Sequence, residues 1–241
     1  MPRIILGIPG KWPTRSDLVR AIAEFSEGYL FAGNVLMNVK SQASWTVDVY
    51  EHDPKLRRAF EVAGQGLIDE PMLDQIGLHT QTLYVIGEEA GLEPARAMLN
   101  VGRALLDAGG LAVKVESCGT AHDAKTWRSL AETAALPPSL YRALVVLVGK
   151  GSRDVFYSCG MHHFGLPDTT VDASVGPDDA ATVMNRFNVY QMSESPKLRT
   201  GHTFSVAADA PRYRLAQRPC EQFPEGDPFH NPDGYWHLTP I

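Results

Sequence analysis

Two short segments of the chain carry the same pattern of chemically capable side chains. Residues 117–122 read SCGTAH and residues 158–163 read SCGMHH, so in both segments Ser-Cys-Gly is followed by histidine. Thiolate and neutral imidazole are ligands that suit the tetrahedral preference of zinc. The two segments therefore offer four candidate zinc ligands, which are Cys118, His122, Cys159 and His163.

The same residues also have a structural interpretation. A free cysteine is among the most commonly buried small side chains. The spacing from Cys118 to His122 differs from the C-x2-C spacing that is typical of structural zinc sites. The adjacent His162 and His163 would point in opposite directions on an extended segment. We therefore expect a structural role, with a zinc site or a redox thiol pair as the alternatives.

Two carboxylates near these segments extend the set of candidate catalytic residues to His163, Asp168 and Glu116. A carboxylate beside an imidazole can act as a general base or support metal-assisted hydrolysis. Asp168 follows Pro167 and also fits a turn or a helix cap, and Glu116 also fits a solvent-facing strand position. No nucleophile-elbow, zinc-protease or dinucleotide-binding motif occurs in the required context.

The elements that must position these residues follow a repeated order. The first part of the chain predicts strands and helices in the order β-α-β-β-α-β, from alternating apolar residues and from helical stripes with caps at Ser16 and Asp53. The second part predicts the same order again. The predicted strands span residues 3–8, 29–40, 44–52, 82–86, 111–115, 140–148, 155–158, 202–206 and 212–215.

This repetition predicts an α+β fold of two tandem ferredoxin-like halves, with helices packed on antiparallel or mixed sheets. The expected halves are residues 1–90 and 111–217, joined by a helix within 91–110 and followed by a C-terminal arm at 218–241. In such a half the first and third strands are parallel neighbours. We therefore expect Cys118 and Cys159, which follow those strands, to meet at one sheet edge at about the 4.8 Å strand spacing.

Composition limits the class of partner. The chain has 241 residues, of which 44% are apolar and 21% charged, as is typical of globular proteins. Its formal net charge of −6 argues against a nucleic-acid partner, because phosphate contacts need a basic surface. The three cysteines are odd in number and sparse, which favours a reducing compartment over a disulfide framework.

The expected location is the cytoplasm. Residues 1–10 contain one arginine and lead directly into a short apolar run, so they lack the charged region and cleavage site of a signal peptide. The longest apolar runs are too short to span a bilayer, and no membrane association is expected.

Three blocks of sequence resemble a known family. The blocks read AGGLAVKVES at residues 108–117, followed by Ala121-His122 and Trp127, then YSCGMH at 157–162 with FGLPD at 164–168, and NPDGYWHL at 231–238. Together they resemble the bacterial domain-of-unknown-function family 4261. The resemblance transfers no catalytic residues. Uncharacterised bacterial domains of this kind are associated with toxin, secretion or stress systems, and the resemblance therefore implies a role in such a system.

Two functions remain open from the sequence. The first is a non-enzymatic binding protein, such as an immunity-type inhibitor of a bacterial toxin or effector, which the acidic balance and the missing catalytic motifs favour. The alternative is a zinc- or thiol-dependent enzyme, hydrolase-like, that uses the cysteine and histidine cluster.

Overall fold

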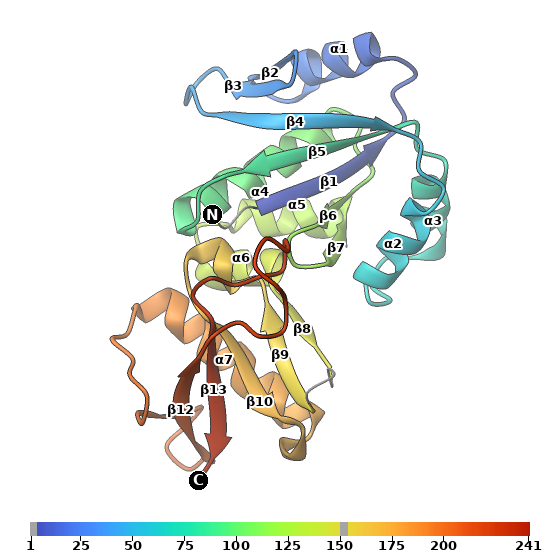
Figure 1. Cartoon of the computed structure of the whole chain (residues 1–241). Coiled ribbons are helices and arrows are strands. Elements are labelled where there is room, and N and C mark those ends of the chain that lie inside the picture. The colour runs from blue at the N-terminus through green and yellow to red at the C-terminus, as the bar shows by residue number, and fades with distance from the viewer. Residues whose placement is uncertain (1–3, 150–153) are drawn as a thin grey trace.

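The protein has a mixed α+β fold built on two β-sheets (Figure 1). The computed structural model describes residues 4–149 and 154–241. The α+β class predicted from the sequence is confirmed. Within the described ranges, no helix is both long and apolar enough to cross a bilayer.

The first sheet has seven strands, and every neighbouring pair is antiparallel. Its first strand by sequence lies near the centre and is almost wholly buried, as expected for the apolar run IILGI. In spatial order the strands are β2 (Tyr29–Ala32), β3 (Val35–Asn38), β4 (Ser44–Glu51), β5 (Gln81–Gly87), β1 (Ile4–Gly10), β6 (Ala112–Val115) and β7 (Thr120–Asp123).

Helices cover one face of this sheet (Figure 1). They are α1 (Arg15–Phe25), α4 (Leu92–Asp107) and α5 (Ala124–Glu132). The fully buried Trp127 of α5 donates from its indole nitrogen to the carbonyl of Leu99 at 3.0 Å. A Cβ atom at Gly102 would lie 2.5 Å from that nitrogen, so the glycine lets the ring pack directly on α4.

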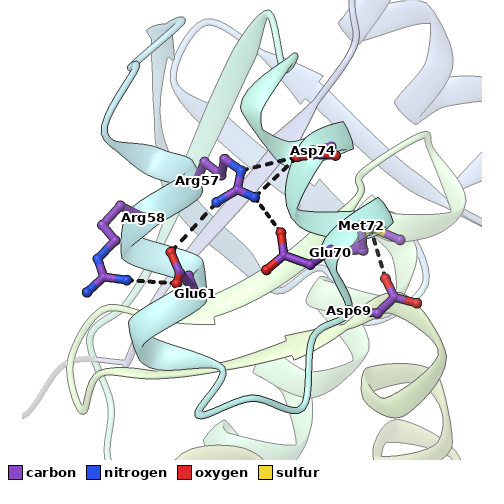
Figure 2. A network of polar contacts seen from close by, with 7 residues as sticks. All are labelled: Arg57, Arg58, Glu61, Asp69, Glu70, Met72 and Asp74. Atoms are coloured by element: carbon purple, nitrogen blue, oxygen red, sulfur yellow. Dashed lines mark hydrogen bonds and ion pairs between the residues drawn. The ribbon is translucent and has the colours of Figure 1, made fainter.

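The opposite face is covered at one end only. The hairpin of α2 (Leu56–Ala63) and α3 (Glu70–Gly77) packs on Ala112 and Ala121 of the last two strands. Arg57 joins the two helices through ion pairs to Glu70 at 2.5 Å and Asp74 at 3.2 Å, as Figure 2 shows. No helix of the described residues covers the central strands β4, β5 and β1 on this side, which leaves part of the sheet face open.

The second sheet has six strands, of which β10 and β13 are parallel and the other neighbours antiparallel. Helix α7 (Pro177–Glu194) covers one face and buries Phe187 against Trp236 and Leu238. In spatial order the strands are β11 (Thr203–Ser205), β12 (Arg212–Arg218), β13 (Tyr235–Pro240), β10 (Asp168–Asp172), β9 (Val155–Cys159) and β8 (Val146–Val148).

Short helices and one long connecting segment lie between or beside the sheets. Helix α6 (Pro137–Leu144) contacts α4, α5 and α7. A 3-10 turn, η1 (Met161–Phe164), follows β9, and a second, η2 (Ala173–Val175), follows β10. The segment 219–234 between β12 and β13, red in Figure 1, loops up to the junction between the sheets.

Two of the predicted strands differ from the prediction in their local structure. Residues 29–40 form the β2–β3 hairpin, because Gly33 has a φ of 57° and makes a tight turn. Residues 140–144 are helical, since Pro137 occupies the first turn of α6. Proline is favourable there because its missing N–H would have no partner. The strand predicted over 140–148 is therefore reduced to β8.

The strand neighbours also differ from those of two ferredoxin-like halves. β1 pairs with β5 and β6, both antiparallel, where that arrangement requires a parallel neighbour. β6 and β7 complete the first sheet, so the expected boundary between residues 110 and 111 falls inside it. The expected arm at 218–241 supplies β13, an inner strand of the second sheet. Residue 3 of the first predicted strand lies outside the described residues.

Candidate functional site

The two Ser-Cys-Gly segments meet in space, although they belong to different sheets. Ser117 follows β6 and His163 lies in η1, and the Ser117 Oγ is 2.8 Å from the His163 Nε2. β6 belongs to the seven-stranded sheet and β9 to the six-stranded sheet. The prediction that β6 and β9 are parallel neighbours in one sheet is therefore wrong, and the segments meet at the junction between the sheets.

A continuous chain of hydrogen bonds passes through this contact. Nδ1 of His163 lies 3.0 Å from the Leu144 carbonyl, which can only accept, so Nδ1 carries the proton. Nε2 of the neutral ring then accepts from the hydroxyl of Ser117, whose oxygen accepts from the Ile5 N–H at 3.2 Å. Burial lowers the pKa of His163 well below its ordinary value, and the neighbouring His162 adds to this effect.

The cysteines of the two segments are buried thiols. The Cys118 Sγ lies 3.9 Å from the Val115 carbonyl, and the Cys159 Sγ lies 4.0 Å from the Phe229 carbonyl. Burial raises the pKa of Cys118 to about 12. Burial also raises the pKa of Cys159, and the charges of Asp168 and of a Cys118 thiolate would raise it further. Both thiols are protonated at neutral pH, whereas a metal or a nucleophilic step requires the thiolate.

His122 faces another part of the core. Its Nε2–H donates to the Ala143 carbonyl at 3.1 Å, and its ring centroid lies 5.8 Å from that of Trp127. Burial lowers the pKa of His122. Among residues 4–149 and 154–241, no group of three or more histidine, cysteine or carboxylate side chains is arranged to hold a metal ion. The four predicted zinc ligands thus do not form a common coordination sphere there.

Asp168 is the buried anchor of the second segment. Its Oδ1 accepts from the Ser158 hydroxyl at 2.9 Å and from the Met161 N–H at 3.2 Å, and its Oδ2 accepts from the Asn231 amide at 2.7 Å. Burial raises its pKa to about 7, and these hydrogen bonds oppose the shift. The side chain is 1% exposed, so Asp168 joins β9, η1 and the 219–234 segment without access to a substrate.

His162 is a buried histidine that the sequence patterns do not single out as a ligand. Among residues 4–149 and 154–241, neither of its ring nitrogens has a hydrogen-bond partner, and its ring centroid lies 4.2 Å from that of His163. Burial lowers the pKa of His162 to about 4, and the positive charge of His230 lowers it further. The main chain of Ser117 opposes this shift, although its contact with the His162 ring does not meet the geometry of a hydrogen bond. His162 therefore behaves as a neutral core residue at physiological pH.

Glu116, the third predicted catalytic residue, lies elsewhere, in a groove on the open face of the first sheet. This acidic groove has a volume of about 680 Å³, which is in the size range of small-ligand sites. The residues that line it and that carry charge or an aromatic ring are Asp48, Tyr50, Glu51, His52, Asp53, Tyr84 and Glu116.

The strand register explains how the floor of the acidic groove is built. Gly7 of β1 lies opposite Tyr84 of β5. A Cβ atom at Gly7 would lie 2.7 Å from the Glu116 Oε1 and 3.1 Å from the Tyr84 ring, so the glycine makes room for both side chains. Tyr84 and Tyr50 meet edge to face, with ring centroids 5.5 Å apart. Lys114 forms an ion pair with Glu116.

The acidic groove carries unbalanced negative charge. Within the described part of the chain, Asp48 and Glu51 have no ion-pair partner, and the Asp53 carboxylate accepts from the Lys55 N–H at 2.9 Å. Burial raises the pKa of Tyr84 to about 12, and the charges of Glu116 and Asp53 contribute. Its hydroxyl therefore stays protonated, so this residue is a donor and an aromatic surface rather than a base.

A pair of histidines fixes one rim of the groove. Nδ1 of His79 donates to the Ile76 carbonyl at 2.7 Å, and its Nε2 accepts from the Asp53 N–H at 3.1 Å. His52 donates from Nδ1 to the His79 carbonyl at 2.9 Å. Burial lowers the pKa of His79, so the neutral ring holds Asp53 at the edge of the groove.

Comparison with known proteins gives no match, whether to a family model, to a curated protein or to a solved structure. The resemblance to family 4261 therefore stays a prediction. Sequence reasoning missed Tyr50, Tyr84 and Asp48 as parts of one surface. Their alternation with buried neighbours along β4 and β5 is the signal that they share a face.

Proposed function

We propose that this protein is a non-enzymatic binding protein that takes a basic segment of a protein partner into the acidic groove, in the manner of an immunity-type inhibitor of a bacterial toxin or effector. The observation that carries the proposal is the open groove itself, in which Asp48 and Glu51, which have no cation partner among the described residues, lie beside two tyrosine rings. Such a surface is complementary to arginine and lysine side chains.

An apolar surface continues the groove across the edge of the same sheet face. Leu30, Val35 and Met37 are 46%, 43% and 38% exposed. Leu30 pairs with Met37, Val35 pairs with Thr46, and Thr46 pairs with Ile86 at the groove, so all of them share one face. Apolar contacts flanked by charged and aromatic groups are typical of protein interfaces.

The chemistry of the groove defines the partner. A guanidinium or ammonium group beside Tyr50 or Tyr84 would gain a cation–π contact, and Asp48 and Glu51 would supply charge-assisted hydrogen bonds. Enzymes that act on nucleic acids carry basic surfaces of this kind. A toxin or effector with such a surface fits the groove, and its active surface would be covered on binding.

The alternative function, a zinc- or thiol-dependent enzyme, has less support. It needs accessible thiolates or a shared coordination sphere. Cys118 and Cys159 are buried thiols with raised pKa values, and His163 is occupied by two hydrogen bonds. These contacts favour a structural role for the cluster.

The test compares capture of a partner by three forms of the protein. The double charge reversal Asp48→Lys with Glu51→Lys should abolish capture from the native host. The control Glu24→Lys with Glu132→Lys changes two exposed helix carboxylates by the same charge and should retain it. The affinity of the identified partner, measured by calorimetry, should fall at least tenfold for the groove variant and decrease with added salt. Equal affinity of all three forms, or no salt dependence, would overturn the proposal.

A further inference from the structure

A second cavity lies on the helix-covered side of the first sheet, opposite the acidic groove. This helix-side cleft has a volume of about 500 Å³ and is bounded by the β3–β4 turn, by Trp45 of β4 and by one face of α4. Strand alternation places Trp45 on this side, because its register partner Leu36 is buried beneath the helices. The volume suits a small organic ligand.

Two aromatic rings form one wall of the helix-side cleft. The ring centroids of Tyr29 and Trp45 are 6.0 Å apart, and the rings are tilted by 36°. Tyr29 is buried and Trp45 is half-buried, and both line the cleft. Such a wall offers a planar surface for stacking.

Two basic side chains of the lining supply positive charge. Arg103 lines the cleft near Tyr29, and its charge opposes the effect of burial, which raises the pKa of Tyr29. Lys40 lines the cleft from the β3–β4 turn. Neither Arg103 nor Lys40 forms an ion pair within the described residues, so both cations are available to a ligand.

The other charges of the cleft are largely compensated. Arg96 pairs with Glu93 at 2.6 Å, and Asp107 pairs with Arg128 at 2.9 Å. Among the described lining residues, this leaves one carboxylate without an ion pair, Glu27, and two cations without one, Arg103 and Lys40. The balance favours an anionic ligand, in contrast to the acidic groove on the other face.

We propose that the helix-side cleft binds a small aromatic anion, which is a planar ring that carries a phosphate or a carboxylate. The ring stacks on Trp45, and the anionic group lies between Arg103 and Lys40. Guanidinium groups form strong charge-assisted hydrogen bonds with both kinds of anion. This site shares none of the lining residues of the acidic groove and does not depend on the function proposed for it.

Calorimetric titration tests the proposal with three probes. Adenosine monophosphate represents the phosphate class, benzoate the carboxylate class, and adenosine an uncharged ring. At least one anion should bind saturably at concentrations up to about 5 mM, and adenosine should bind at least tenfold more weakly than its monophosphate. No saturable binding of either anion, or equal binding of adenosine and its monophosphate, would overturn the proposal.

Variants locate the site. Arg103→Gln should weaken binding of the anion roughly tenfold, whereas Arg20→Gln, a change at an exposed arginine of α1, should leave it unchanged. Lys40→Gln should also weaken it, and it decides the question if Arg103→Gln does not fold, because Lys40 is exposed. Unchanged affinity in folded Arg103→Gln, or in Lys40→Gln in its place, would contradict the assignment.

Discussion

The Ser117 hydroxyl and the His163 imidazole form a buried hydrogen bond of 2.8 Å across the junction between the two sheets. Both residues are fully buried, and 46 positions separate them in the chain. Nδ1 of His163 also donates to the carbonyl of Leu144 at the end of α6. The Ser117 Oγ also accepts from the N–H of Ile5 in β1. These two side chains thus connect two sheets that share no strand within the described ranges.

Replacing His163 by alanine should therefore destabilise the protein by about 2–4 kcal/mol, because the change opens a cavity and leaves a hydroxyl and a carbonyl unpaired. The free energy of unfolding in denaturant measures the effect. His202→Ala, at an exposed position, is the control and should cost less than about 0.5 kcal/mol. A similar small cost at His163 would contradict the structural role.

Stability should fall as the pH drops from about 6.5 toward 4. Burial lowers the pKa of His162 to about 4 and that of His163 well below its ordinary value. The unfolded state therefore takes up protons in this range before the folded state does, which costs about 1.4 kcal/mol per pH unit for each ring. His162→Phe should reduce the slope of unfolding free energy against pH, and an unchanged slope would count against a neutral buried ring.

Asp168 should contribute a pH dependence of the opposite sign. Burial raises its pKa to about 7 from an ordinary value of 3.8. The folded state then holds the proton more tightly, so this contribution is present below pH 3.8 and is lost as the pH rises to 7. Asp168→Asn does not titrate, and its stability relative to the natural protein should rise between pH 4 and 7. A constant difference would contradict the raised pKa.

Thiol reactivity should separate the cysteines. Cys118 and Cys159 are buried, whereas Cys220 is half-buried. In the native protein, a chromogenic disulfide reagent should therefore modify Cys220 first, and all three thiols should react after denaturation. Cys220→Ser should abolish the fast reaction. Metal analysis of the same preparation should find no stoichiometric zinc, and rapid reaction of Cys118 would instead favour a thiol-dependent enzyme.

Gly7→Ala should weaken partner binding severalfold by filling the floor of the acidic groove. The new methyl group would meet the Glu116 carboxylate at 2.7 Å and the Tyr84 ring at 3.1 Å, and both side chains would have to move. Gly149→Ala is a matched control, because a Cβ atom there meets nothing within 4 Å. Calorimetry with the captured partner measures both variants, and equal affinities would argue against a site at Gly7.

Local patterns in the sequence were sufficient to predict most helices. The stripe that begins at Leu18 marks α1, and Pro94 with Gly109 brackets α4. The α+β class follows from such elements. Strand neighbours depend instead on contacts between distant residues, and β13 illustrates this, because it pairs with β10 and β12. Its own residues, rich in aromatic side chains, do not specify those partners.

The buried cluster was only partly predictable. The repeated Ser-Cys-Gly pattern singled out two segments that do meet. The contact with His163, however, is made by Ser117, which was not among the proposed metal ligands. The acidic groove was harder to find. Its residues come from β4, β5 and the end of β6, and β1 lies between β5 and β6. Only the register of these four strands brings Asp48, Tyr84 and Glu116 together.

The parallel pair of β10 and β13 has a consequence for biosynthesis. β13 ends at Pro240 and lies between β10 and β12. Until the ribosome has released this strand, β10 and β12 present unpaired edges, which favour aggregation. The seven-stranded sheet is complete once residue 123 has emerged, so the nascent chain is expected to carry one finished sheet beside one that closes only after translation of residue 240.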